Sequence, residues 1–257
     1  VITATISAVQ SKDVTIPLTV TGTSTIDTDY STAFASKTGT TVVGKNGSGS
    51  GLNQLKSPRN ITLDSSGNIY VADTNNNRIM KWESGASVGT VVAGGNGSGT
   101  ANNQFYRPRD VKVDNNGNIY VSDHYNHRIM KWAPGASSGT VVAGGNGSGS
   151  NLNQLSNPYG IDMDSSGNIY VADRGNYRIM KWSPGATSGI VVAGLDGEGS
   201  GPNQLKWPSH VVVNSLGDLY VSDTSNNRIQ KIKISPEITI PSGSTSGTIT
   251  FTGIQDS

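Results

Sequence analysis

The chain contains no cysteine among its 257 residues. It therefore cannot form a disulfide, a thiolate-ligated zinc or iron–sulfur site, or a cysteine nucleophile. Charged residues are scarce as well, at 14% of the chain against about 25% in an average soluble domain. The formal net charge of +1 disfavours electrostatic capture of nucleic acid or of an anionic membrane surface.

Long hydrophobic runs are also missing. No apolar stretch approaches the roughly 18 residues that a membrane-spanning helix needs, so we expect a soluble chain without membrane insertion. What the chain has in abundance is glycine, with 33 residues, together with serine, threonine and asparagine. That composition is typical of short strands joined by turns.

A unit of 50 residues recurs four times. The segment DSSGNIYVAD begins at Asp64 and returns unchanged at Asp164, with variants at Asp114 and Asn214. RIMKW recurs in step with it and becomes RIQKI in the last copy, starting at Arg78, Arg128, Arg178 and Arg228. A third segment resembling GTVVAGGNGSG begins at Gly39, Gly89, Gly139 and Gly189. Internal repetition at this spacing is typical of stacked or radial repeat folds.

Each unit reads as four short strands with no helical periodicity. The first strand follows a proline, at Pro58, Pro108, Pro158 and Pro208. A tight turn with glycine leads to the second strand, at Gly67, Gly117, Gly167 and Gly217. Four-stranded antiparallel sheets repeated radially form a β-propeller, so we predict an all-β fold with four blades of four strands.

The strand order predicts how the ring closes. A fourth-type strand at residues 40–44 precedes the first complete unit, whereas the last unit ends after its third strand. We expect residues 40–44 to pair beside residues 228–234 and so remove a free sheet edge. An open arc completed by a partner is the competing interpretation.

Residues 38–234 resemble the NHL repeat family. The pattern of proline, G-(I/V)-x-(V/L)-D, G-N-I-Y-V-A-D and N-x-R-I occurs in four copies. The resemblance implies a β-propeller over residues 35–235, although NHL rings commonly hold more than four blades.

The flanks, residues 1–34 and 236–257, alternate threonine with apolar residues, as in DVTIPLTVTG and EITIPSG. Together they resemble a partial Calx-beta domain into whose loop the propeller is inserted, which meeting propeller ends would tolerate. The acidic segment that carries calcium ligands in that family is missing here, so no calcium is expected. An incomplete sandwich exposes strand edges, which invites completion by another copy.

Residues that repeat in every unit favour a structural role. An aspartate precedes each repeated arginine by five positions, as Asp73 precedes Arg78, and we predict an intrablade brace. The repeated aromatic residues are expected to pack between blades: Trp82, Trp132, Trp182, Tyr70, Tyr120, Tyr170 and Tyr220. The basic residues outside these repeats look scattered, which lowers an RNA-binding interpretation.

Positions that vary between units are more informative, because packing does not dictate them. The residues directly after the four prolines predict a ligand site at the propeller mouth, formed by Arg59, Arg109, Tyr159 and His210. The resemblance to NHL-like peptide-amidating lyases implies metal-binding histidines near this level, but the matching positions hold Asn60, Asp110 and Gly160. We therefore expect no metal, no cofactor and no catalytic residue. His124 and His127 fall in an ordinary turn.

Four sequons are glycosylation candidates, at Asn46, Asn60, Asn96 and Asn146. The alternative is that N-G-S-G simply forms a flexible turn.

Taken together, these features predict a secreted structural module, one unit of a longer tandem protein, that builds a fibre or surface array through strand completion and carries glycans. The alternative is a carbohydrate- or protein-recognition module using the mouth. An NHL-type lyase ranks last.

Overall fold

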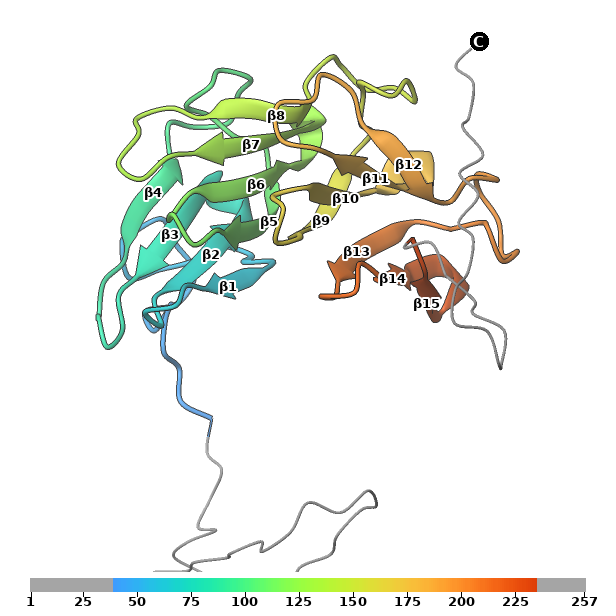
Figure 1. Cartoon of the computed structure of the whole chain (residues 1–257). Helices are drawn as coiled ribbons and strands as arrows, with labels where there is room; N and C mark the ends of the chain where they lie inside the picture. Colours follow the sequence, from blue (N-terminus) through green and yellow to red (C-terminus); the bar gives the residue numbers. More distant parts are fainter. Residues whose placement is uncertain (1–38, 235–257) are drawn as a thin grey trace, which may run out of the picture. The chain divides into compact units, whose positions relative to one another are not determined.

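The computed structural model describes residues 39–234, which form four antiparallel sheets (Figure 1). The first sheet comprises β1 (Ile61–Leu63), β2 (Ile69–Asp73), β3 (Arg78–Trp82) and β4 (Thr90–Gly94). The second comprises β5 (Pro108–Val113), β6 (Ile119–Asp123), β7 (Arg128–Trp132) and β8 (Thr140–Gly144). The third comprises β9 (Pro158–Met163), β10 (Ile169–Asp173), β11 (Arg178–Trp182) and β12 (Ile190–Ala193), and the last β13 (Pro208–Val213), β14 (Leu219–Asp223) and β15 (Arg228–Ile232).

Helical structure within residues 39–234 is confined to one 3-10 turn per unit, at Thr74–Asn76, His124–Asn126, Arg174–Asn176 and Thr224–Asn226. None of these turns has the length or the apolar character to cross a bilayer.

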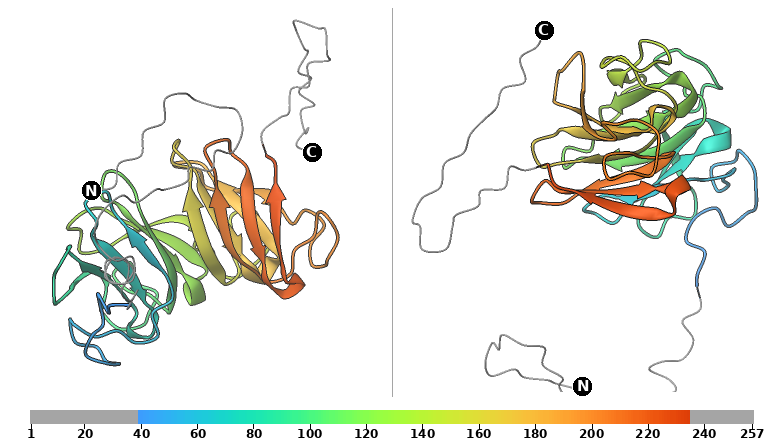
Figure 2. Two further views of the ribbon diagram at one scale, coloured as in Figure 1. Left: turned by 90° about the horizontal axis from the view of Figure 1, so that it is seen from below. Right: turned by 90° about the vertical axis from the view of Figure 1, so that its right-hand side faces the viewer.

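The predicted all-β architecture with four blades is confirmed. Strands follow in order within each sheet, and the inner strands contact in succession, β1 with β5, β5 with β9 and β9 with β13 (Figures 1 and 2). All four sheets belong to one compact unit that begins at Val42.

The predicted closing strand is not formed. Residues 40–44 have no strand structure. Within residues 39–234 the last sheet contains three strands, and the series of blades stays open on one side (Figure 1). Val43 instead packs on the first sheet beside Trp82, as Ala93 packs on the second blade's cluster. The apolar contact with the following blade is thus kept without the strand pairing. The expected meeting of residues near 38 and 235, like the Calx-beta flanks, lies outside the described residues.

The turn between the first and second strands explains the repeated D-x-x-G-N-x-Y motif. Asp64 Oδ1 accepts hydrogen bonds from the backbone N–H groups of Ser66 and Asn68, both at 3.0 Å. Its Oδ2 accepts from Asn68 Nδ2 at 2.8 Å and from the Tyr70 hydroxyl at 3.1 Å. Gly67 adopts a φ of +78°, which side-chain-bearing residues rarely take. These bonds lower the pKa of Asp64 despite the opposing effect of burial.

The predicted intrablade brace is present in every unit. In the second unit, Arg128 Nε donates to Asp123 Oδ2 at 2.8 Å. The terminal guanidinium nitrogens donate to backbone carbonyls of the preceding loop, at Thr100, Ala101 and Gln104. Asp123 Oδ1 accepts from the Tyr106 backbone N–H at 2.7 Å. One ion pair therefore ties the turn after the second strand to the loop that leads into the first.

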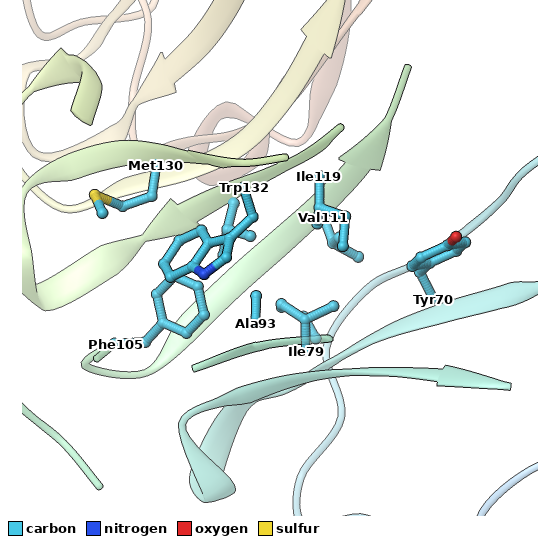
Figure 3. Close-up of a cluster of buried hydrophobic side chains, with 10 residues drawn as sticks. Tyr70, Ile79, Ala93, Phe105, Val111, Ile119, Met130 and Trp132 are labelled. Carbon is cyan, nitrogen blue, oxygen red and sulfur yellow. The ribbon is translucent and has the colours of Figure 1, made fainter. Parts of the chain in front are cut away.

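The apolar core lies between blades, as predicted from the repeated aromatics. Tyr220 is the exception: it is 39% exposed, because no blade follows the last one within residues 39–234. Figure 3 shows Ile79 and Ala93 of the first blade beside Phe105 and Trp132 of the second, with Tyr70 on the Val111 and Ile119 side of the same cluster. The Phe105 and Trp132 rings lie 4.6 Å apart between centroids. Equivalent clusters join the second blade to the third and the third to the last. Packing of this kind holds neighbouring blades together without covalent links.

The braces differ in exposure, and this difference leads to a stability prediction in which one brace serves as the control for another. The Arg178 side chain is 9% exposed, whereas that of Arg228 in the last, uncovered blade is 33% exposed. Removing one partner of a buried ion pair leaves the other charge buried without a partner, which lowers stability by about 3–5 kcal/mol. We expect Arg178→Met to lower the free energy of unfolding by about that much and Arg228→Met by less than half of it. Urea titration at pH 7 measures both, and equal losses would contradict burial as the cause.

Candidate functional site at the propeller mouth

The four predicted mouth residues meet in one cavity. The cavity has a volume of about 370 Å³ and takes two residues from each blade: Arg59, Asn60, Arg109, Asp110, Tyr159, Gly160, Ser209 and His210. These positions directly follow the prolines that begin the inner strands. We call this cavity the mouth.

Asp110 is the only carboxylate among the residues that line the mouth. It is buried and accepts 2.7 Å hydrogen bonds from the backbone N–H groups of Val111 and Ile161. Its Oδ1 also accepts from Asn60 Nδ2. Burial raises the pKa of Asp110, against the opposing effects of these bonds and of His210. Both oxygens are thus engaged in joining the first three blades.

His210 reaches across the mouth from the last blade. Its Nδ1 lies 3.6 Å from Asp110 Oδ2. A side chain at position 160 would collide with this imidazole and with the backbone beneath it, so Gly160 makes the approach possible. The glycine that interrupts the pattern of polar residues therefore has a steric role at this site.

An arginine and aromatic network lies beside the cavity. The guanidinium groups of Arg109 and Arg174 each lie 5.1 Å from the centre of the Tyr159 ring. Arg174 also lies 4.8 Å from Trp207, and Arg107 lies 5.8 Å from Tyr125. Stacking on aromatic faces holds guanidinium groups in place while leaving their N–H donors free.

The arginines of the chain divide into two sets of four. The brace arginines, which are Arg78, Arg128, Arg178 and Arg228, donate to carboxylates and carbonyls. The other four are Arg59 and Arg109, which line the mouth, and Arg107 and Arg174, which lie beside it; we call these four the mouth arginines. Within residues 39–234, no guanidinium of this second set donates a hydrogen bond or forms an ion pair, and the Nε atoms of Arg109 and Arg174 are buried without a partner.

The mouth arginines act on one another and on their neighbours. Burial lowers the pKa of Arg109, and the nearby charges of Arg59 and Arg107 lower it further. The sequence interpretation that the remaining basic residues are scattered is therefore wrong for these four arginines. Arg107 lies just before a proline, whereas Arg174 lies in a 3-10 turn. Because these positions have different offsets within the repeat, linear spacing did not reveal that both residues lie near Arg109.

His124 and His127 occupy the 3-10 turn region, as predicted, but they differ in surroundings. His124 is 5% exposed, and its Nδ1 lies 3.0 Å from the Pro158 carbonyl of the next blade. In the first unit Thr74 Oγ1 donates to the Pro108 carbonyl at 2.7 Å. The same inter-blade hydrogen bond is thus made by two different side chains.

The buried imidazole predicts acid sensitivity. Burial and the charges of Arg109 and Arg174 lower the pKa of His124 to about 4, although its bond to Pro158 opposes the shift. In the unfolded chain the pKa of this imidazole is about 6.5. The free energy of unfolding is therefore highest above that pH and falls as the pH drops toward 4. We expect His124→Thr, which keeps the bond to Pro158, to remove this loss. Between pH 7.5 and 4.5 the wild type should lose about 2 kcal/mol more than the variant.

Chemical denaturation at the two pH values measures this difference. Parallel pH profiles for the wild type and His124→Thr would contradict a neutral buried imidazole.

A larger hollow of about 540 Å³ lies between the second and third blades. Its walls are repeated residues such as Val141, Ala143 and Trp182, without a titratable side chain. The mouth is therefore the better candidate for a functional site, because it gathers charged groups and residues that differ from blade to blade.

Three of the four candidate sequons are exposed at the same place in successive units, at Asn46, Asn96 and Asn146. Asn60 differs, since its amide nitrogen donates to Asp110 inside the mouth. A glycan on Asn60 would replace that bond. Glycosylation at all four sites stays a prediction.

The family model for the NHL repeat matches four segments, residues 55–82, 105–132, 155–182 and 205–232. The chain carries four NHL repeats. Each matched segment runs from the loop before the proline to the repeated tryptophan or isoleucine, so the repeat covers three strands of a blade. This match confirms the NHL resemblance, whereas the Calx-beta resemblance of residues 1–34 and 236–257 stays a prediction.

A search of curated protein sequences found no match. Among solved structures, a protein of unknown function from Bacteroides thetaiotaomicron is 18% identical with a TM-score of 0.55, over 66% of this chain and 46% of its own. An auxiliary nutrient binding protein from the same organism is 15% identical with a TM-score of 0.52, over the same shares. A chain of a nidogen/laminin complex is 21% identical with a TM-score of 0.54, over 75% of this chain and 62% of its own.

The chain thus spans about half the length of the first two structures. At these identities the likeness supports the propeller fold alone.

Proposed function

We propose that this NHL-repeat chain is a non-enzymatic carbohydrate-recognition module that binds its ligand in the mouth. The observation that carries the proposal is the gathering of blade-specific polar side chains around one cavity of about 370 Å³. Ligand sites usually combine a cavity with a few convergent polar groups. A non-enzymatic role fits the structural use of Asp110, the only carboxylate that lines the mouth, which is buried and accepts hydrogen bonds from Val111, Ile161 and Asn60.

The lining favours a sugar over an apolar peptide side chain. Asn60, Ser209 and His210 offer amide, hydroxyl and imidazole groups, which hydrogen-bond to sugar hydroxyls. Apart from the Tyr159 ring, the mouth offers no large apolar wall. A nutrient-binding protein and a chain of a nidogen/laminin complex, both similar in fold, are consistent with binding roles on this fold.

Binding to a glycan array tests the recognition role. We expect a subset of glycans to bind the wild type, and Tyr159→Ala to weaken that binding at least tenfold by releasing Arg109 and Arg174 from their stacking partner. Lys181→Ala, on β11 away from the mouth, is the matched control and should bind as the wild type does. No glycan above background, or equal binding by Tyr159→Ala, would remove the proposal.

Self-assembly is a second candidate, favoured by the open edge of the last sheet. Within residues 39–234, β15 is the edge strand of the last sheet. Ile229 on β15 is 65% exposed, whereas the equivalent Ile179 is fully buried in the cluster that joins the third blade to the last. An uncovered strand of this kind pairs readily with another strand. We propose that an adjoining copy completes β15 in an extracellular fibre or surface array, a location that the exposed sequons would also suit.

The strand register of the complete blades gives a direct test. Ile79 pairs with Ala93 and Ile179 with Ala193, so the 50-residue repeat places Val43 opposite Ile229. Paired side chains in a sheet lie close enough for a disulfide, and the chain has no cysteine to interfere. We expect the double variant Val43→Cys and Ile229→Cys to oxidise into covalent oligomers, read on non-reducing gels. Each single variant serves as the control.

A cross-linked monomer would show closure within one chain and would contradict assembly at this edge. Absence of any cross-link, with a monomeric mass by light scattering, would contradict it as well.

A further inference from the structure

The mouth contains more positive charge than its own groups neutralise. All eight arginines of the chain lie within residues 39–234. Each brace arginine makes four hydrogen bonds through its guanidinium group, as Arg128 does with Asp123 and three carbonyls. Within residues 39–234, the guanidinium groups of the mouth arginines donate no hydrogen bond. A guanidinium with free donors is a ready partner for a carboxylate or sulfate.

Asp110 does not fill this role. Its Oδ1 accepts from Asn60 and the Val111 backbone, and its Oδ2 accepts from Ile161 and lies near His210. Asp162 lies on β9, two residues after the mouth residue Gly160. Its side chain forms an ion pair with Lys112 at 3.1 Å and accepts a hydrogen bond from the Val213 backbone N–H. The acids of the inner strands are thus occupied by backbone groups and by lysine, not by the mouth arginines.

Arg109 is held ready for an incoming anion. Its Nε is buried without a partner, and its guanidinium lies over Tyr159 from the next blade. Tyr159 is in turn contacted by Arg174 and by the edge of His124, with ring centroids 5.5 Å apart. A side chain fixed in this way loses less conformational freedom when it binds.

From this geometry we infer that the mouth recognises an acidic sugar, with Arg109 and Arg59 binding its carboxylate and the polar groups of Asn60, Ser209 and His210 binding its hydroxyls. The inference rests on the carbohydrate-recognition role proposed above and adds the class of sugar. The cavity volume lies near the lower end of the range for small-ligand sites, which suits one sugar unit of a chain. The aromatic rings act mainly as supports for the guanidinium groups.

Three probes of equal length separate charge from sugar shape: a galacturonate trimer, its methyl ester and a galactose trimer. Isothermal titration at low ionic strength should give binding of the acid at least tenfold tighter than of the ester or the neutral sugar, because a charged hydrogen-bonded contact is lost in both. Added salt should weaken the acid's binding.

The variants Arg109→Ser and Arg59→Ser locate the anion. Serine is the residue that the last blade itself carries at this position, as Ser209, so the fold accepts it. Each variant should weaken binding of the acid at least tenfold and bring it close to that of the ester. Lys181→Ala removes one positive charge elsewhere and should leave all three affinities unchanged. Circular dichroism and thermal melting check that each variant is folded.

The possible failures differ from one another. Equal binding of the acid and its ester would overturn the acidic class but keep the recognition role. Equal weakening by Lys181→Ala and Arg109→Ser would reveal diffuse charge attraction and overturn the site. A polyglutamate peptide that competes at the mouth more strongly than the acidic trimer would overturn the sugar assignment. If no probe binds and the glycan array is also blank, both the inference and the recognition role fall.

Discussion

The rest of the structure depends on the ion pair between the aspartate that ends each second strand and the arginine that begins each third. In the first unit, Arg78 donates to Asp73 and also to the carbonyls of Ser50, Gly51 and Gln54. Asp73 in return accepts from the Lys56 backbone. The pair therefore fixes the loop that enters the blade, and that loop leads directly to the proline and the mouth residue Arg59. A buried pair of this kind needs its full set of hydrogen bonds to be tolerated, and each unit supplies that set from backbone carbonyls.

This arrangement separates what holds the fold together from what distinguishes one blade from another. Packing uses the strands, where Trp82, Trp132 and Trp182 are almost wholly buried in equivalent places. Chemistry that differs between blades collects at the ends of the inner strands and in the 3-10 turns. Because the brace positions these loops, their side chains can change from arginine to tyrosine or serine without disturbing the core. The result is one face with several unpaired cations on an otherwise balanced chain.

The last blade shows what an outer strand contributes. Asp223 and Arg228 keep the brace at 2.7 Å, but the arginine side chain is more exposed than its equivalents. Burial raises the pKa of Asp123 and Asp173, whereas at Asp223 it is outweighed by hydrogen bonds from Asn226, Lys206 and Arg228, and the pKa is lowered. Within residues 39–234 the last blade has neither a fourth strand nor a following blade. The hydrogen bonds of its brace still form, but its arginine is less shielded from water. That uncovered edge distinguishes this blade from the other three.

The sequence by itself determined the repeat, the strand types, the brace and the residues around the mouth. Those features follow from local rules that recur every 50 residues. Glycine occurs where φ is positive, aspartate occurs where the N–H groups of a turn need an acceptor, and residues vary where packing does not restrict them. It also led to Arg59, Arg109, Tyr159 and His210, because all four occupy one position in the repeat.

Only the tertiary structure decided how separate units combine. Arg109 of the second blade and Arg174 of the third both approach the Tyr159 ring, from positions with no common spacing. Likewise, residues 40–44 have the composition of an outer strand, but pairing with β15 requires the first and last blades to meet. Local sequence sets the preference of a segment for a strand, whereas the presence of a partner at its edge depends on the curvature that accumulates over all the blades.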